Sequence, residues 1–364
     1  MNKFNPFCYA PWTTAQYSGT YNGGGISPCC EWKGKKFKGE VKDYNTSEYL
    51  ENIKTAMLNH DMEMINETCF ECITSENHGS KSARNYIERD LNSKRYTAGV
   101  LNKLDYRPDN LCNLKCRMCS MNSSSLIEEE FVAHGWNPIV QRDTTDVMDF
   151  DLSNLKCLAI LGGEPTVNKR MFPILDYLIE NGMNETTRLN YTTNCTSINK
   201  PWMSRVGKFK DVHVNLSVDA AGKAYEYIRT GAEWKKVKEN IPRIISIAED
   251  YKIQMVVQTN SFAIIEDWFE YFLQFPPEKV NMSPMMGIPG KLDCIPDDIK
   301  EQKIAYLSSL NHPTAEQAIK HFNIHKYNLD EVKKYKRYNG WLDSIRGTNI
   351  LDLDPIFDKI INTV

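Results

Sequence analysis

The stretch LNKLDYRPDNLCNLKCRMC, residues 101–119, decides the fold. Its first part, residues 101–107, has the apolar pattern of a short β-strand. A loop follows and carries Cys112, Cys116 and Cys119 in a C-x3-C-x2-C spacing. Thiolates are soft ligands that suit iron–sulfur clusters and zinc, and three of them on one loop can meet at a common point. The stretch therefore predicts a metal site directly after a strand.

Downstream of this loop, five more apolar stretches predict strands, and amphipathic stretches between them predict helices. Strands that alternate with helices are typical of a parallel sheet, so six such units predict an α/β fold, an incomplete TIM-like (β/α)6 barrel. Catalytic groups in such folds gather at the carboxyl ends of strands. The expected strands are residues 157–161, 188–193, 212–218, 253–259 and 279–283, and the expected helices are residues 124–134, 169–181, 202–209, 234–251 and 266–275.

The sequence predicts three parts. Residues 1–98 are turn-rich, hold five cysteines and show one convincing helix near residues 47–58, so we expect an irregular auxiliary metal-binding module. Residues 99–295 are expected to form the barrel. Residues 296–364 are expected to be a charged, helical C-terminal extension, to which no chemistry can be assigned.

The composition is ordinary for a globular protein, with 41% hydrophobic and 25% charged residues. A net charge of -3 gives no basic field, so no nucleic-acid partner is expected. We see neither a secretory signal nor an apolar run of about 18 residues, and we expect a cytoplasmic protein without a membrane partner. In that reducing compartment, clustered cysteines among the 11 present are expected to bind metal rather than form disulfides.

The cysteine loop allows two kinds of metal site. Three cysteines on a four-iron cluster leave one iron open to an outside ligand. A zinc ion held by three cysteines and a distant fourth ligand is the alternative, although no matching His or Cys follows nearby.

The segment CNLKCRMC resembles the cysteine motif of the radical S-adenosylmethionine (radical SAM) superfamily, which also follows the first strand. The resemblance implies that Cys112, Cys116 and Cys119 hold a 4Fe–4S cluster whose open iron binds S-adenosylmethionine. Reductive cleavage of that cofactor gives a 5'-deoxyadenosyl radical, which abstracts hydrogen from a substrate. Met118 occupies the place where the family packs a side chain, commonly aromatic, near the adenine.

The next expected strand ends in a glycine pair and a carboxylate, Gly162-Gly163-Glu164, followed by proline. Glycines let the backbone approach a ligand closely, and Glu164 can accept hydrogen bonds from an ammonium group. Taken alone, this tetrapeptide is more often a simple turn. It resembles the family's GGEP motif, which binds the amino group of S-adenosylmethionine.

Three further cofactor contacts are implied by the same resemblance. Asn194 and Ser217, near the ends of expected strands, are assigned to the ribose, and Arg229 to the methionine carboxylate. Each has an ordinary alternative: Asn194 as a turn residue, Ser217 as filler of the barrel interior, and Arg229 as a surface ion pair. No catalytic acid or base can be named.

The N-terminal cysteines form a second group, with Cys8 before Pro11-Trp12, then the pair Cys29-Cys30, then Cys69-x2-Cys72. On spacing alone, structural zinc is as good an explanation as an iron–sulfur cluster. The arrangement resembles the auxiliary-cluster modules called twitch and SPASM domains, although these usually follow the barrel. The sequence CITSENHGSKSAR from Cys72 resembles a set of twitch-domain radical enzymes with the reversed order. The resemblance implies Cys8, Cys29, Cys69 and Cys72 as ligands of an auxiliary iron–sulfur cluster, expected to be 4Fe–4S, with Cys30 as a substitute or a neighbouring thiol.

The remaining features receive simpler interpretations. Three isolated cysteines, Cys157, Cys195 and Cys294, are expected to be structural. A run of five lysines is expected to be a solvated surface, and it offers a docking site for an acidic electron donor of the flavodoxin or ferredoxin type. These lysines are Lys33, Lys35, Lys36, Lys38 and Lys42.

Two functional hypotheses follow. The first is a radical SAM oxidoreductase with an auxiliary cluster that modifies, dehydrogenates or epimerises a peptide or small-molecule substrate. The second is a non-catalytic iron–sulfur or zinc-binding redox or scaffold protein that retains the fold.

Overall fold

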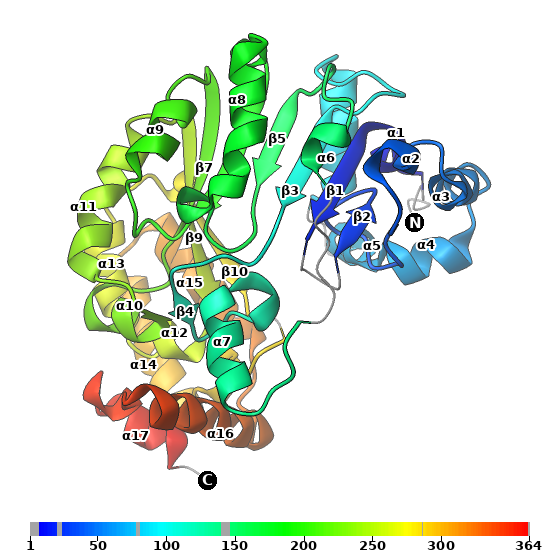
Figure 1. Ribbon diagram of the computed structural model, residues 1–364. Helices are drawn as coiled ribbons and strands as arrows, with labels where there is room; N and C mark the ends of the chain where they lie inside the picture. Colours follow the sequence, from blue (N-terminus) through cyan, green and yellow to red (C-terminus); the bar gives the residue numbers. More distant parts are fainter. Residues whose placement is uncertain (1–6, 20–23, 78–80, 140–145, 286, 363–364) are drawn as a thin grey trace. The chain divides into compact units, whose positions relative to one another are not determined.

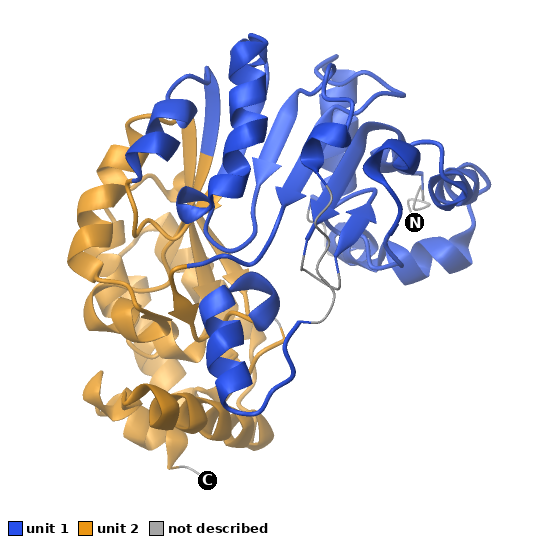
Figure 2. Ribbon diagram, viewed as in Figure 1, with its two compact units in different colours: residues 1–112, 121–191, 199–213 blue, residues 113–120, 192–198, 214–364 orange. Residues whose placement is uncertain are grey.

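The structure, a computed structural model, describes residues 7–19, 24–77, 81–139, 146–285 and 287–362. Within them the chain has a mixed α/β fold (Figure 1). It divides into two compact units, and each unit is made of three separate segments of the sequence (Figure 2). Unit 1 comprises residues 1–112, 121–191 and 199–213, and unit 2 comprises residues 113–120, 192–198 and 214–364. The chain therefore passes from unit 1 to unit 2 inside the cysteine loop.

Unit 1 contains a mostly parallel sheet. Strand β1 pairs in parallel with β3, β3 with β5, and β5 with the first part of β6, while β2 runs antiparallel to β1. The bounds are β1 Thr14–Ser18, β2 Gly25–Ser27, β3 Lys103–Arg107, β5 Cys157–Ile160 and β6 Arg188–Thr193.

The strand register separates apolar from polar side chains in this sheet. Leu104, Leu158 and Leu189 lie opposite one another across β3, β5 and β6, and all three are fully buried. Successive residues of a strand point to opposite faces, so Asp105 and its partner Gln16 lie on the other face. One face of the sheet is therefore an apolar core and the other carries polar groups.

Unit 2 holds the later strands and a small two-stranded sheet. Strand β9 pairs in parallel with β10, and the amide of Val218, just after β7, donates to the carbonyl of Gln254 in β9 (2.9 Å). The small sheet joins β4 antiparallel to β8. The bounds are β4 Lys115–Cys116, β7 Asp211–Ser217, whose first three residues belong to unit 1, β8 Arg229–Thr230, β9 Asp250–Val257 and β10 Val280–Pro284.

The helices that follow the cysteine loop are α7 Ser125–Ala133, α8 Phe172–Glu180, α9 Lys200–Val206, α10 Gly222–Ile228, α11 Trp234–Ile245, α12 Thr259–Phe262 and α13 Glu266–Phe272. The C-terminal region forms α14 Asp297–Ser309, α15 Pro313–Ile324, α16 Leu329–Arg346 and α17 Ile356–Ile361, and it is helical as expected.

All six strands predicted from residue 101 onward are present, displaced by three residues at most at either end. A mixed α/β fold with a parallel sheet is confirmed, and it is consistent with the predicted partial barrel. The division into residues 1–98, 99–295 and 296–364 stays a prediction.

The prediction that residues 1–98 are irregular beyond one helix is wrong. The expected helix is α3 Glu48–Leu58, which Ser47 caps by accepting from the amide of Leu50. Strand β1 was not predicted, because an alternation of polar and apolar residues only five residues long is a weak signal inside a turn-rich segment; all five of its residues are buried. The other helices are short: α1 Ala10–Thr13, α2 Val41–Tyr44, α4 Met62–Thr68, α5 Phe70–Asn77 and α6 Ala83–Asn92.

The helix expected over residues 234–251 is too long by six residues. Helix α11 ends at Ile245, and β9 begins at Asp250. No helix in the described part of the chain combines the length and the hydrophobicity needed to cross a bilayer.

Candidate functional site

Two of the three loop cysteines are held together in unit 2. Cys116 is buried in β4, directly opposite Arg229 of β8. The amide of Cys119 donates to the carbonyl of Cys116 (3.0 Å), which closes a tight turn. The amide of Arg117 between them donates to the carbonyl of Ile228 (2.8 Å). Backbone hydrogen bonds therefore fix both residues before any metal is considered.

Cys112 belongs to unit 1 and is half-buried. Its amide donates to the hydroxyl of Ser125 (3.3 Å) at the beginning of α7, which Ser124 caps. Cys112 is therefore anchored by residues of unit 1, whereas Cys116 and Cys119 are anchored by residues of unit 2.

The glycine pair lies against the chain just before Cys112. The amide of Glu164 donates to the carbonyl of Leu111 (2.7 Å). A Cβ at Gly163 would lie 2.0 Å from that same carbonyl oxygen, and one at Gly162, whose φ is +114°, would lie 2.9 Å from the carbonyl oxygen of Asp109. Two backbone segments approach too closely here for any side chain. The predicted cofactor segment and the first cysteine are therefore neighbours within unit 1.

Glu164 is buried, and its carboxylate has a visible local role. One oxygen accepts from the amide of Thr166 (3.1 Å) and from the Thr166 hydroxyl (2.7 Å), so Glu164 caps the short turn Pro165–Val167. The capping bonds hold the carboxylate in one orientation. Its contact with a cofactor amine stays a prediction.

Asn194 contacts the cysteine loop inside unit 2. Its amide nitrogen donates to the side-chain oxygen of Asn113 (3.0 Å), and its side-chain oxygen accepts from the hydroxyl of Thr196 (2.6 Å). The Asn113 side chain in turn donates to the Thr196 hydroxyl (2.8 Å). Three polar side chains thus close a ring between the end of β6 and the loop. Asn113 and Thr196 were missed because single polar residues in loops carry no pattern.

Arg229 is a buried residue rather than the surface ion pair weighed as an alternative. Its Nε and Nη2 donate to the carboxylate of Asp219 (2.8 and 2.7 Å), and its Nη1 lies 3.8 Å from the sulfur of Cys116. Asp219 is fully buried and also accepts from the amide of Val256 (2.8 Å). The Arg229–Asp219 pair is therefore built into the protein beside the thiol.

Electrostatics in this pair follow from burial. Burial raises the pKa of the Asp219 carboxyl, while Arg229 and the Val256 amide oppose that rise. Burial also raises the pKa of the Cys116 thiol, which the Arg229 guanidinium partly offsets. A cation fixed beside a sulfur favours its thiolate form, the form that binds metal.

Met118 and Ser217 are half-buried, with Met118 between two cysteines and Ser217 at the last position of β7. Their assignments to adenine and ribose stay predictions. The isolated cysteines Cys157, Cys195 and Cys294 are all buried, which agrees with the expected structural role.

The four predicted auxiliary ligands line one pocket in unit 1. Cys8, Cys29, Cys69 and Cys72 come from three separated segments and face this pocket, whereas the adjacent Cys30 is not among its lining residues. Chain segments more than 60 residues apart therefore converge where the resemblance implied a shared site. The other lining residues are Ala10, Glu31, Ile65, Thr68, Ile73, Ala83, Arg84 and Ile87.

Local packing places these thiols in apolar surroundings. Cys8, Cys29 and Cys69 pack against a small core that includes Trp32 and Ile65. Burial raises the pKa of the Cys8 thiol to about 12 and raises those of Cys29 and Cys69 as well. A bound cation would supply the positive charge that thiolates need in such a place.

Arg84 of α6 contributes a cation to the rim of the pocket. Its Nη1 donates to the carbonyl of Phe7 (3.2 Å), next to Cys8, and its Nε donates to Glu76 (3.1 Å). The donor set of four soft thiols fits an iron–sulfur cluster chemically. Among the described residues, no three His, Cys, Asp or Glu side chains gather closely enough to hold a single metal ion.

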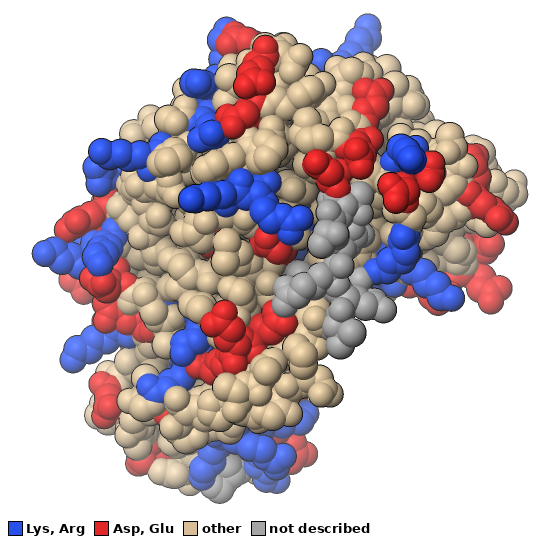
Figure 3. Space-filling model, in the orientation of Figure 1, with Lys and Arg blue, Asp and Glu red and all other residues tan. Residues whose placement is uncertain are grey.

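The lysine run is not one uniform surface. Lys33, Lys35, Lys38 and Lys42 are exposed, as expected, but Lys36 is half-buried. Burial, with Lys38 and Arg107 nearby, lowers the pKa of Lys36 to about 8. On the face shown in Figure 3, acidic and basic side chains are interspersed, in keeping with the net charge of -3.

Comparison with known families bears on these features. Residues 106–258 match the family model described as the radical SAM superfamily. The match includes the cysteine loop, the glycine pair and Arg229, and it supports this superfamily for the matched segment. A domain of this kind implies a 4Fe–4S cluster and S-adenosylmethionine. No curated protein matches the chain significantly.

Among solved structures, the chain is similar to "Native anSMEcpe with bound AdoMet", with 19% identity, 57% of this chain and 59% of that chain covered, and a TM-score of 0.39. It is also similar to Streptococcus suis SuiB bound to precursor peptide SuiA, with 17% identity, coverage of 74% and 60%, and a TM-score of 0.37. A third similarity is to TYW1 with a lysine-pyruvate adduct bound, with 16% identity, coverage of 56% and 72%, and a TM-score of 0.32. The matches cover 59% and 60% of the first two structures.

Proposed function

We propose that this protein is a radical SAM enzyme that uses a 5'-deoxyadenosyl radical to abstract hydrogen from its substrate. The observation that carries the proposal is the cysteine loop itself. Leu111, just before its first cysteine, lies beside Gly163 and Glu164 in unit 1. Its second cysteine, Cys116, lies beside Arg229 in unit 2. Gly163, Glu164 and Arg229 are all expected to bind the cofactor. The family match over residues 106–258 supports the same class.

Cys112, Cys116 and Cys119 would hold the catalytic cluster. A 4Fe–4S cluster there would supply one electron to the sulfonium of S-adenosylmethionine bound at its open iron, which breaks a carbon–sulfur bond. The side chains of the protein would bind and orient the cofactor. Glu164, held by its bonds to Thr166, would accept from the amine, and Arg229, held by Asp219, would contribute positive charge beside Cys116.

Gly162 and Gly163 are proposed to let the backbone approach the cofactor closely. Asn194 and Ser217 are proposed for the ribose, and Met118 for the adenine. Asn194 is supported by its hydrogen bond to Asn113 of the cysteine loop, which brings the end of β6 to that loop.

The N-terminal pocket is proposed to hold an auxiliary 4Fe–4S cluster, bound by Cys8, Cys29, Cys69 and Cys72. Its support is the shared pocket of these four thiols in unit 1. With all four cysteines bound, such a cluster would relay electrons rather than bind substrate. A peptide or small-molecule substrate, a flavodoxin or ferredoxin as donor, and a cytoplasmic location complete the proposal.

The test is anaerobic. The full chain is loaded with iron and sulfide, reduced, and incubated with S-adenosylmethionine, and 5'-deoxyadenosine is measured. We expect cleavage by the wild type and none by Cys116→Ala. The matched control is Cys157→Ala, a buried cysteine in β5, which should retain cleavage. Absence of 5'-deoxyadenosine from the wild type with both clusters intact would refute the proposal.

A further inference from the structure

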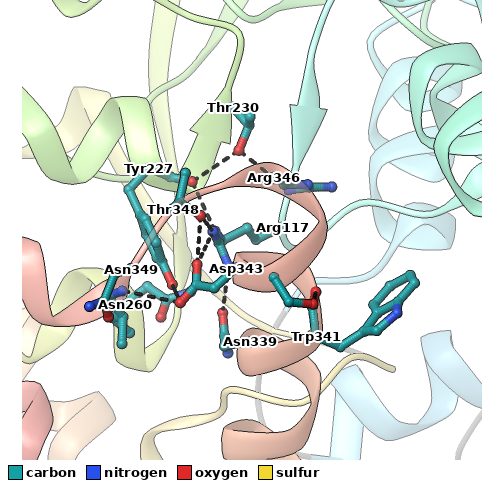
Figure 4. A network of polar contacts seen from close by, with 12 residues as sticks. Arg117, Tyr227, Thr230, Asn260, Asn339, Trp341, Asp343, Arg346, Thr348 and Asn349 are labelled. Atoms are coloured by element: carbon teal, nitrogen blue, oxygen red, sulfur yellow. Dashed lines mark hydrogen bonds and ion pairs between the residues drawn. The ribbon is translucent and has the colours of Figure 1, made fainter.

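Arg117 lies between two loop cysteines, and its side chain is only 1% exposed. A guanidinium keeps its charge in proteins. Burial of a charge is costly unless it is paired and fully hydrogen-bonded. Its partners come from the end of α10 and from the C-terminal region near the end of α16, all within unit 2 (Figure 4).

Each nitrogen of the guanidinium has an acceptor. Nη2 donates to the carboxylate of Asp343 (2.6 Å) and to the hydroxyl of Thr348 (2.7 Å). Nη1 donates to the side chain of Asn339 (3.3 Å), and Nε donates to the carbonyl of Tyr227 (3.0 Å). The guanidinium also lies 3.6 Å from the centre of the Tyr227 ring. This combination of charge pairing and stacking suits arginine and not lysine.

The end of α16 is shaped to receive this side chain. Gly347 adopts a left-handed conformation (φ 63°), which turns the chain back after the helix. The hydroxyl of Thr348 (2.6 Å) and the amide of Ile350 (3.1 Å) then donate to the carboxylate of Asp343. The hydroxyl of Tyr227 donates to the same carboxylate (3.2 Å). Asp343 is therefore fixed by three donors besides the guanidinium.

Helix α16 also holds the backbone of the loop. The hydroxyl of Tyr338 donates to the carbonyl of Arg117 (2.8 Å), and Nη1 of Arg346 donates to the carbonyl of Lys115 (2.9 Å). These two carbonyls flank Cys116 in the sequence. The helix thus contacts the loop on both sides of the buried cysteine.

We propose that α16 clamps the cysteine loop and that Arg117 is the positioning residue through which it sets the places of Cys116 and Cys119. This inference rests on the proposed function, because it takes these cysteines as cluster ligands. It assigns a role to the C-terminal helices, which lie outside the segment that matches the radical SAM family model.

The role of Arg117 is positional rather than electrostatic. Each of the two arginines pairs with an aspartate, but Arg229 also directs Nη1 at the Cys116 sulfur, whereas the guanidinium of Arg117 donates to Asp343, Thr348, Asn339 and Tyr227. Thiolates must meet a cluster at set distances and directions. Ligands held in place beforehand lose less conformational freedom when the cluster binds.

The main test variant replaces both charges, Arg117→Met together with Asp343→Leu. Loss of one partner alone would leave a buried charge and destabilise the fold, whereas apolar replacement of both is commonly tolerated. We expect near-native secondary structure and full iron loading at the N-terminal cysteines. The loop should retain less iron than in the wild type. The change that S-adenosylmethionine causes in the spectrum of the reduced cluster should be smaller, and cleavage should slow by about tenfold or more.

Two further variants separate positioning from general stability. Tyr338→Phe removes the hydrogen bond from the Tyr338 hydroxyl to the loop and should raise the KM for S-adenosylmethionine while leaving the thermal midpoint close to that of the wild type. Arg205→Met is the control, because Arg205 also pairs with an aspartate, Asp176 (2.7 and 2.8 Å), and stacks on Phe172 (4.2 Å), but in unit 1. Its cleavage rate should remain that of the wild type.

The clamp is wrong if the double variant folds and its loop iron, spectral response and cleavage rate stay within twofold of the wild type. Failure of the proposed function looks different, because the wild type itself would then release no 5'-deoxyadenosine. Iron retention at the loop of the double variant would still decide the clamp in that case.

Discussion

The carbonyl oxygen of Leu111 occupies the space that a side chain at Gly163 would need. A Cβ built at Gly163 would lie 2.0 Å from that oxygen and 2.3 Å from the carbonyl carbon. Both atoms belong to the backbone just before Cys112, so neither can rotate away. The glycine pair therefore couples the end of β5 to the first cysteine by direct contact.

Gly163→Ala should displace the chain beside Cys112. We expect a loss of about 1–3 kcal/mol in the free energy of unfolding, the usual cost of overpacking, and a marked loss of S-adenosylmethionine cleavage. Denaturant unfolding and 5'-deoxyadenosine release measure the two effects.

The control for that substitution is Gly340→Ala in α16. Outside its own helix and chain neighbours, no described residue comes within 4 Å of a Cβ at Gly340, and alanine favours a helix by about 1 kcal/mol over glycine. This variant should be as stable as the wild type or more so. If Gly163→Ala behaved in the same way, the close approach of the two backbones would not matter for function.

Local patterns account for what could be predicted. The cysteine loop and the strands after it were recognisable because each is defined by residues close together in the sequence. Strand β1 was not, because its local signal is a five-residue alternation in a turn-rich segment, and only its pairing with β3, almost 90 residues away, identifies it as a strand of the sheet. Arg117 was not either, because its partners Asn339 and Asp343 lie 222 and 226 residues away. Long-range pairs of single polar residues have no periodicity by which to find them.

The Arg229–Asp219 pair predicts that replacing one partner costs more stability than replacing both. Arg229→Met should leave the carboxylate of Asp219 buried without its ionic partner, at a cost of about 3–5 kcal/mol in the free energy of unfolding. Arg229→Met combined with Asp219→Leu should recover most of that stability. It should not recover cleavage, since the cation beside Cys116 would still be absent.

Denaturant unfolding combined with 5'-deoxyadenosine assays makes this comparison. Recovery of cleavage along with stability in the double variant would show that Arg229 serves the fold alone.

The Asp211 carboxylate in unit 1, which two arginines and a histidine surround, predicts how stability depends on pH. Asp211 lies 2.9 Å from Arg95, 3.0 Å from Arg188 and 3.0 Å from His213. Partial burial tends to raise the pKa of Asp211, but Arg188 and Arg95 hold it below its ordinary value. Stability from this group is therefore present above the unfolded pKa, about 3.9, and is lost as the pH falls through the lower folded value.

Asp211→Asn should accordingly be less stable than the wild type near pH 7, and the two proteins should converge in strong acid. Urea unfolding from pH 7 down to about pH 2 tests this, because the loss occurs below the unfolded pKa of about 3.9. A stability difference that stays constant over the whole range would assign the effect to packing instead.

The N-terminal pocket makes adjacent cysteines unequal. Cys29 lines the pocket with three other thiols, whereas Cys30 is not among the lining residues. Cys29→Ala should therefore lose iron from the N-terminal site, while Cys30→Ala should retain it. Because metal binding stabilises a site that unfolded chains lack, loss of iron should also speed hydrogen exchange in α3 to α5.

Iron analysis and hydrogen exchange on the two variants measure these effects under the same conditions. The two substitutions remove the same side chain from neighbouring positions, so a general effect of cysteine loss would appear in both. Equal iron content in both variants would mean that the pocket does not select Cys29. Loss of iron from Cys30→Ala alone would make Cys30 the ligand. The chain around Cys30 would then have to rearrange when iron binds, since its thiol lies outside the pocket.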